Sequence, residues 1–267
     1  YKFNKTWVDA DGKKITENYL GDDFELTVNF QLQVSADGLK TWENASKYFS
    51  ENGIKTDAVE VNGATQGTEG DWDTASITGT VNASAWNTGG TFENLPTVIK
   101  KGDDYISLQY RVIETSVSYG ESVSQTISLP EDGQNDSKFS YSLENQPPGL
   151  VTGADFERAE NSGLSTSTNK FSTTEVSVTK VWEDGSNQYN TRPGVSAPMT
   201  WTAWFLLQRT TDDAAWENVA VVKLYGGDGN DENGAPDTEK WVHTFAGLPA
   251  ADYSSGTGQN YTYRVRE

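Results

Sequence analysis

Hydrophobic and polar residues alternate along most of this chain. Residues 24–34, 201–207 and 219–225 have an apolar side chain at nearly every second position, and clusters of Gly, Asn and Asp separate such segments. Because successive side chains of a strand point to opposite faces, this period predicts strands with one buried face. Short strands with frequent turns predict an all-β fold of antiparallel sandwiches. Residues 39–52 instead have apolar residues at helical spacing, and we expect a helix there.

Two lysines interrupt the alternation on the apolar side of a strand. In residues 1–7 (YKFNKTW), Lys5 shares the side of its aromatic neighbours. In residues 176–182 (VSVTKVW), Lys180 shares the side of the valines and the tryptophan. A lysine at a strand end can extend its amine to solvent, but an ammonium group inside a core is costly unless it is paired or neutralised. Two lysines at such positions indicate a chemical use for the amine.

Glutamates occupy similar inward positions on two other strands, and the sequence around them is repeated. Glu114 ends the segment YRVIE, and Glu267 ends the segment YTYRVRE. Residues 86–96 and 241–249 both run from a tryptophan through a phenylalanine to Leu-Pro. The Leu-Pro pairs and the glutamates are each 153 positions apart, whereas the lysines are 175 apart. We therefore expect two copies of one domain, the first with about 22 additional residues (175 − 153).

Four pieces in this order resemble the Cna B-type domains of Gram-positive surface proteins. They are the lysine strand 179–184 followed by Arg192 and Pro193, the Trp…Phe-x-x-Leu-Pro turn, the Tyr-x-Val-x-Glu strand, and the closing segment 166–171. No single piece is specific, since each alone can occur by chance, but three of the four are repeated. The resemblance leaves inserts at about 35–80 and 120–162 unexplained. It implies two tandem Ig-like, Greek-key antiparallel β-sandwich domains, at 1–174 and 175–267, the second without its last strand in this chain.

In the first domain the resemblance implies a spontaneous intramolecular isopeptide bond between Lys5 and Asn169, with Glu114 assisting the reaction. Burial would favour a neutral, nucleophilic amine and a protonated acid that donates to the Asn169 carbonyl. The site would react once and release ammonia, so we expect no enzyme acting on other molecules. Lys2 has the opposite parity, and Asn161 lies in a polar stretch without a strand pattern, so both are weaker candidates for the linkage.

In the second domain the resemblance gives Lys180 and Glu267 the same roles. In the first copy 55 positions separate the glutamate from the asparagine, so we expect the asparagine partner of Lys180 beyond residue 267. Lys180 is therefore expected to lack that partner, and the second domain to hold no isopeptide bond as it stands.

Composition restricts the remaining possibilities. The 39 acidic and 20 basic residues give a net charge of −19, which opposes binding to nucleic acid. There is no cysteine for a disulfide or a thiolate metal site, and one histidine excludes a multi-histidine site. No apolar run approaches the roughly 20 residues that cross a membrane. We expect no cofactor and no membrane insertion in this segment.

One acidic loop of the second domain has oxygen ligands at a spacing similar to that of calcium loops. They are Asp228, Asn230, Glu232 and Glu239. Asn233 stands where such loops need glycine, and no flanking helices are evident. A solvated hairpin tip is the stronger interpretation, and no metal site is expected.

Two classes of function remain. The resemblance implies a structural stalk module of an extracellular, cell wall-anchored adhesin or pilin, whose partners are neighbouring domains of the same surface protein. A bond between first and last strands would carry tension without unzipping the sheet, and would also stabilise the fold. The alternative is an adhesive region in which the enlarged first domain binds a host matrix protein or glycan. Trp42, Trp72 and Trp86 lie in or near its inserts and suit such recognition if exposed, although tryptophans of β-sandwiches lie more often in the core.

Overall fold

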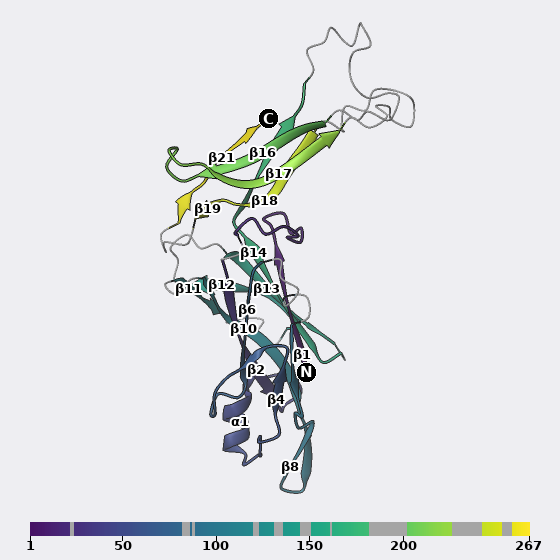
Figure 1. The fold of residues 1–267 in the computed structure, drawn as a ribbon. Helices are drawn as coiled ribbons and strands as arrows, with labels where there is room; N and C mark the ends of the chain where they lie inside the picture. Colours follow the sequence, from purple (N-terminus) through teal and green to yellow (C-terminus); the bar gives the residue numbers. More distant parts are fainter. Residues whose placement is uncertain are drawn as a thin grey trace, which may run out of the picture. The chain divides into compact units, whose positions relative to one another are not determined.

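The protein is all-β with a short helix, which confirms the predicted fold class (Figure 1). The computed structural model describes residues 1–21, 24–81, 86, 89–119, 123–130, 136–144, 151–160, 162–181, 202–225, 242–252 and 258–267. These residues form two compact units, unit 1 within Tyr1–Ser172 together with Gly258, and unit 2 within Thr173–Asp252 and Gln259–Glu267. Thr173, where unit 2 begins, is also the first residue of a strand.

Unit 1 is built from two layers of strands. Its elements are β1 (Lys2–Val8), β2 (Leu26–Ser35), β3 (Glu43–Asn44), α1 (Ala45–Glu51), β4 (Glu60–Asn62), β5 (Thr65–Gln66), β6 (Thr74–Gly79), β7 (Gly90–Glu93), β8 (Val98–Lys101), β9 (Asp104–Ser107), β10 (Gln109–Tyr119), β11 (Val123–Ser128), β12 (Lys138–Glu144), β13 (Val151–Ala159) and β14 (Leu164–Phe171). Hydrogen bonds connect them in the order β4-β7-β1-β14-β13-β12-β11-β10-β2-β6-β5, with β3 on β2 and with β8 and β9 as a separate hairpin. The first half of β12 pairs with β13 and its second half with β11, so β12 joins the β1–β14 layer to the β10–β2 layer.

The strand β1 shows the predicted alternation. Phe3, Lys5 and Trp7 are buried, whereas Lys2 is exposed. Phe3 packs across the layers against Phe30 of β2, with ring centroids 4.8 Å apart. The aromatic face of β1 thus forms part of the core of unit 1 and places Lys5 inside it.

The first and last strands of unit 1, β1 and β14, lie side by side and run parallel. The other described strand pairs of this unit are antiparallel, as predicted. A parallel pair needs a long connection between its strands, and here the rest of unit 1 provides it.

The helix predicted over residues 39–52 is shorter than expected, since α1 covers Ala45–Glu51. Leu39 has a φ of 72°, which is outside the right-handed helical region. The side chain of Asp37 also accepts hydrogen bonds from two backbone N–H groups that follow. A turn therefore occupies the first part of the predicted helix.

Unit 2 has its own core. Its strands are β15 (Thr173–Thr179), β16 (Thr202–Thr210), β17 (Glu217–Tyr225), β18 (Val242–Pro249), β19 (Ala251–Asp252), β20 (Gln259–Asn260) and β21 (Thr262–Arg266). They form the sheets β15-β18, β17-β16-β21 and β19-β20. Val178 of β15 packs against the cluster of Ala203, Phe205 and Leu224 from β16 and β17. The two larger sheets therefore share a core.

Each unit contains an equivalent hydrogen bond from a tyrosine hydroxyl to a proline carbonyl oxygen. In unit 1 the hydroxyl of Tyr110 donates to the carbonyl oxygen of Pro96. In unit 2 the hydroxyl of Tyr263 donates to the carbonyl oxygen of Pro249 at 2.7 Å. Each tyrosine lies 14 positions after its proline. This equivalence supports the internal repeat found in the sequence.

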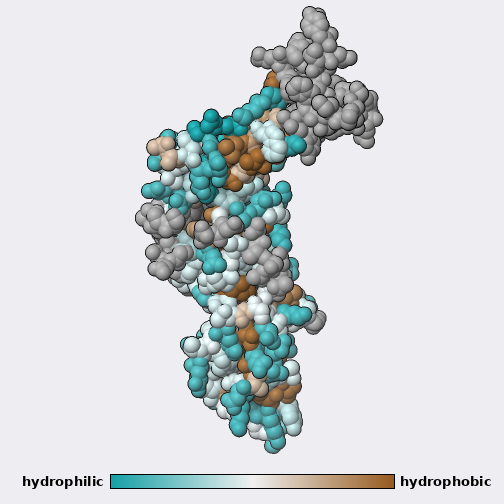
Figure 2. Space-filling view, in the orientation of Figure 1, coloured by the Kyte–Doolittle hydropathy of each residue, from teal (hydrophilic) through white to brown (hydrophobic). Residues whose placement is uncertain are grey.

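The visible surface of the described residues is mostly hydrophilic or neutral, with apolar side chains in separate patches (Figure 2). Among the residues with a described position, the large hydrophobic ones that are exposed are Val98, Tyr105, Val181, Trp204, Val221 and Val242. Within the part of the chain that the structure describes, no helix has the length and apolar character needed to cross a membrane.

Candidate functional site

Lys5, Glu114 and Asn169 meet in the core of unit 1. Lys5 comes from β1, Asn169 from the neighbouring strand β14, and Glu114 from β10 in the opposite layer; each is at most 1% exposed. Nζ of Lys5 lies 3.4 Å from Oε2 of Glu114. Nδ2 of Asn169 donates to Oε1 of Glu114 at 2.6 Å. One carboxyl group thus contacts the amine through one oxygen and the amide through the other.

The parallel pairing of β1 and β14 brings the amine toward the amide. Its register places Lys5 opposite Ser167 and Trp7 opposite Asn169, so Asn169 lies two residues further along on the same face. Nζ of Lys5 is 3.9 Å from the centroid of the Trp7 ring. The lysine side chain therefore extends along the strand toward the level of Asn169.

A β-bulge follows Glu114 on β10. The pairing of β10 with β2 shifts register between Glu114 and Ser116, and the hydroxyl of Thr115 donates to the carbonyl oxygen of Asn29 at 3.1 Å. A bulge adds one residue to a strand and changes the direction of the side chains beside it. For this reason Glu114 and Val117 are both buried although they lie an odd number of residues apart.

Burial changes the protonation of the lysine. It lowers the pKa of Lys5 to about 8, and the negative charge of Glu114 offsets part of that effect. Desolvation disfavours the ammonium form, whereas the carboxylate and the Trp7 ring favour it. Burial therefore shifts Lys5 toward the neutral amine, which is the nucleophilic form.

The Asn169 side chain has an unsatisfied acceptor. Its Oδ1 is buried and has no hydrogen-bond partner, which costs about 1–3 kcal/mol for a buried polar atom. Rotation about the Cβ–Cγ bond exchanges Oδ1 and Nδ2, and a protonated Glu114 can then donate to the carbonyl. Such a hydrogen bond draws electrons from Cγ and favours attack on it by an amine. The site therefore holds a nucleophile, an acid and an electrophile away from solvent.

Two residues that contact Glu114 were not predicted from the sequence. Oγ of Ser167 donates to Oε2 of Glu114, and the backbone N–H of Glu114 donates to the hydroxyl oxygen of Tyr141 at 3.3 Å. Both Ser167 and Tyr141 are buried. Ser167 has the parity of Asn169, a signal that was available in the sequence. Tyr141 reaches the site from β12, and no local pattern indicates that contact.

In unit 2 the two predicted residues form an ion pair. Nζ of Lys180, directly after β15, lies 2.6 Å from Oε1 of Glu267, directly after β21. Their side chains are 18% and 53% exposed, in contrast to the fully buried pair of unit 1. A pair so open to water contributes about 0–1 kcal/mol. Unit 2 thus brings its lysine and glutamate together without the burial found in unit 1.

Several residues singled out in the sequence lie outside the described part of the chain. They are Asn161, Trp182, Arg192, Pro193 and the weak calcium candidates Asp228, Asn230, Glu232 and Glu239. Among the residues that the structure does describe, no group of three or more His, Cys, Asp or Glu side chains is arranged to hold a metal ion.

The three tryptophans considered for ligand binding pack within unit 1. Trp86 is buried, with its ring 5.4 Å from that of Trp7. Trp72 stacks on Phe49 with ring centroids 5.6 Å apart. Trp42 is half-buried, and the guanidinium of Arg111 lies 4.5 Å from its ring centroid. These contacts are those of core and near-core residues.

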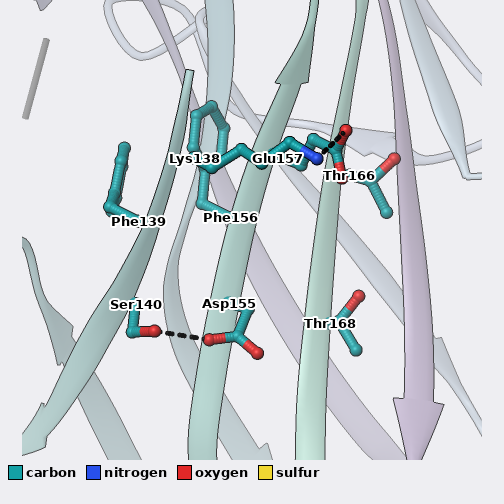
Figure 3. Close-up of a pocket in the computed structure, with 8 residues that line it drawn as sticks. All are labelled: Lys138, Phe139, Ser140, Asp155, Phe156, Glu157, Thr166 and Thr168. Carbon is teal, nitrogen blue, oxygen red and sulfur yellow. Dashed lines mark hydrogen bonds and ion pairs between the residues drawn. The ribbon is translucent and has the colours of Figure 1, made fainter. Parts of the chain in front are cut away.

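A groove lies on the outer face of β12, β13 and β14 (Figure 3). Lys138 pairs with Glu157 at 2.9 Å, and Oγ of Ser140 donates to Asp155 at 2.6 Å. The threonines of β14 that line the groove alternate with Ser167 and Asn169, so the groove lies on the opposite face from the Lys5 site. Its charged and polar side chains contact one another, as is typical of a solvated sheet face.

Comparisons of the chain with protein-family models, with curated proteins and with solved structures found no match.

Proposed function

We propose that unit 1 forms an intramolecular isopeptide bond between Lys5 and Asn169 with the help of Glu114. On this proposal the chain is a load-bearing stalk module, similar to Cna B-type domains, of an adhesin or pilin at the surface of a Gram-positive cell. The observation that supports it most is that a buried amine and a buried amide contact the two oxygens of one buried carboxyl group. A buried ion pair adds little stability by itself, so a covalent product accounts better for this arrangement.

The reaction begins from the neutral pair, in which Lys5 is an amine and Glu114 is protonated. This pair has the same number of protons as the ion pair and forms from it when one proton passes from Nζ of Lys5 to Glu114. Nζ of Lys5 attacks Cγ of Asn169, and the bond from Cγ to Nδ2 breaks. Glu114 takes one proton from the attacking nitrogen and gives its own to the leaving nitrogen, which departs as ammonia. The carboxyl is restored, and a neutral amide replaces the ionisable amine.

The fixed positions of the reacting groups account for much of the acceleration of this reaction. An amine and an amide react very slowly in water, but groups held in contact avoid the entropy cost of an encounter. The core of unit 1 holds both groups against the same carboxyl, because β1 and β14 are direct neighbours and β10 faces them. The product amide also removes the cost of keeping a charge in the core.

The strand arrangement suits a module under tension. Because β1 and β14 are parallel, force that pulls the start of β1 away from the end of β14 acts along the strands and loads their hydrogen bonds together. A bond between Lys5 and Asn169 would transmit this force directly from β1 to β14. The chain between those residues would then carry no load.

Single-molecule pulling of the full chain tests this role. In the wild type the segment between Lys5 and Asn169 should not extend, so the gain in length should come from the rest of the chain. The variant Lys5→Met, which keeps the apolar stem but lacks the amine, should extend through the whole of unit 1. Lys2→Met, at an exposed position of the same strand, is the matched control. Equal extension of the wild type and Lys5→Met would overturn the load-bearing role.

The alternative is an adhesive role, with a host matrix protein or glycan as the partner of unit 1. The packing of Trp42, Trp72 and Trp86 within the unit makes the stalk role the preferred proposal. A solid-phase assay of the chain on host matrix proteins and glycans separates the two. Saturable binding that Trp42→Ala abolishes would favour the adhesive role, and no saturable binding would favour the stalk.

A further inference from the structure

We propose that Ser167, with support from Tyr141, is a positioning residue that decides which oxygen of Glu114 carries the proton. Ser167 keeps Oε2 as a hydrogen-bond acceptor, and the proton then resides on Oε1, which faces Asn169. The inference rests on the isopeptide reaction proposed above and assigns each carboxyl oxygen its own part in it.

Ser167 contacts the same carboxyl oxygen as the amine. It lies opposite Lys5 in the β1–β14 register and two residues before Asn169 on the same face. Its Oγ donates to Oε2 of Glu114, the oxygen that lies 3.4 Å from Nζ of Lys5. Oε1 is the oxygen that meets the side chain of Asn169. The two oxygens of Glu114 are therefore distinct before any reaction begins.

Tyr141 lies beside the same residue from another strand. Its hydroxyl oxygen accepts a hydrogen bond from the backbone N–H of Glu114 at 3.3 Å. Burial, together with the nearby charge of Glu114, raises the pKa of Tyr141, so the phenol keeps its hydrogen. Tyr141 therefore holds the backbone of Glu114, and Ser167 holds its carboxyl group.

The hydrogen bond from Ser167 separates the acid from the base within one carboxyl group. A proton on Oε2 would compete with the hydrogen that Ser167 donates there. Oε1 accepts from Nδ2 of Asn169, but rotation of that amide replaces the donor by the carbonyl oxygen, so the protonated form of Glu114 carries its proton on Oε1. From Oε1 the proton is given to the amide of Asn169. As Nζ of Lys5 bonds to Cγ of Asn169, Oε2 receives the proton that the nitrogen loses. Each proton moves to a group already in contact, and Glu114 ends protonated as it began.

The rate of cross-linking in newly made protein tests this role. The full chain is synthesised in a cell-free reaction, samples are transferred to a range of pH and quenched in denaturant, and the linked fraction is measured by intact mass. Ser167→Ala should slow linkage about tenfold or more, as when an outer partner that orients a reactive ligand is removed. Ser167→Thr keeps the hydroxyl and should restore most of the rate.

Ser165→Ala is the matched control. Ser165 is on the same strand and face and is also buried, but its Oγ hydrogen-bonds with the Tyr1 hydroxyl and with the backbone N–H of Val112. Its rate and pH profile should match those of the wild type. If Ser167→Ala fails to fold, Ser167→Cys decides the question, because the thiol has nearly the same size but is a weak donor and should slow linkage in the same direction.

The outcomes separate this inference from the function on which it rests. If Ser167→Ala links at the wild-type rate with the same pH profile, the positioning role is wrong and the isopeptide bond stands. If Ser167→Ala and Ser167→Thr are equally slow, packing and not the hydroxyl matters, and the role is again wrong. If the wild type never loses ammonia, the proposed function fails, and the inference fails with it.

Discussion

Nζ of Lys5 lies 3.4 Å from Oε2 of Glu114, and neither side chain is exposed to solvent. In the interior, desolvation of two charges can exceed their mutual attraction, so a buried ion pair is weak support for a fold. Here the pair also touches the amide of Asn169 through Glu114. Conversion of amine and amide to a linked, neutral product would relieve that desolvation. The relation of Lys5 to Glu114 is therefore better explained as the starting point of a reaction than as a stabilising contact.

Replacing Glu114 by glutamine should leave unit 1 folded but unlinked. Glutamine has nearly the same size, but it neither takes a proton from Lys5 nor gives one to the leaving nitrogen. The expected result is a protein with a wild-type circular dichroism spectrum and the full calculated mass. Glu157→Gln, on the exposed face of β13, is the control and should link normally. Complete linkage of Glu114→Gln would remove Glu114 from its role.

Removing the amine should lower stability strongly. Lys5 and Asn169 are 164 positions apart (169 − 5), and a cross-link that closes so long a loop contributes about 5 kcal/mol by the chain-entropy estimate. Lys5→Met should therefore unfold at much lower denaturant concentration than the wild type, whereas Lys2→Met should not. A loss under about 1 kcal/mol would indicate that no such link existed.

The unlinked protein should become more stable as the pH rises. Asn169→Ala lacks the electrophile, so Lys5 keeps an amine whose pKa burial lowers from 10.5 to about 8. Between these values the unfolded chain binds a proton that the folded chain does not, so the free energy of unfolding rises with pH. The rise is about 3 kcal/mol over the whole interval. Denaturant unfolding at a series of pH values measures it.

The linked wild type is the control for this pH dependence. If the proposed reaction has occurred, the Lys5 nitrogen of the wild type is part of an amide and does not titrate. The rise of the unfolding free energy with pH that is expected for Asn169→Ala should therefore be missing. Ionisation of tyrosines affects both proteins and cancels in the comparison. An identical pH dependence in the two proteins would contradict the assignment of the rise to Lys5.

The tyrosine-to-proline hydrogen bond that occurs in both units should stabilise each unit separately. Tyr110→Phe leaves the carbonyl oxygen of Pro96 without its donor, and Tyr263→Phe does the same to Pro249. Each change should lower the stability of its own unit by about 1 kcal/mol, the usual net value of such a hydrogen bond. Hydrogen exchange measured in both units would show which one is affected. If either change lowered the stability of both units equally, the two hydrogen bonds would not act independently.

Much of the fold and three site residues could be predicted because the signals are local or repeated. Alternation in β1 identifies the side on which Lys5 lies, and the repeat identifies Glu114 as a matching residue. The position of Asn169 came from a resemblance in the closing strand. Strand parity needs only neighbouring residues, and for that reason it can be read without the structure.

The remaining features depend on contacts between distant parts of the chain. The position of Tyr141 beside Glu114 follows from the passage of β12 between the two layers, and no local pattern specifies it. The bulge after Glu114 reflects the pairing of β10 with β2. The parallel neighbours β1 and β14 likewise come from the two ends of unit 1. Ser167 is the exception, since its parity with Asn169 was visible in the sequence.

The most direct measurement is the intact mass of the purified wild-type protein, followed by peptide mapping. The account predicts a mass lower than the calculated one by a single ammonia, with a branched peptide that joins Lys5 to Asn169. The full calculated mass, with Lys5 and Asn169 recovered in separate, unmodified peptides, would contradict the isopeptide bond and the stalk mechanism built on it.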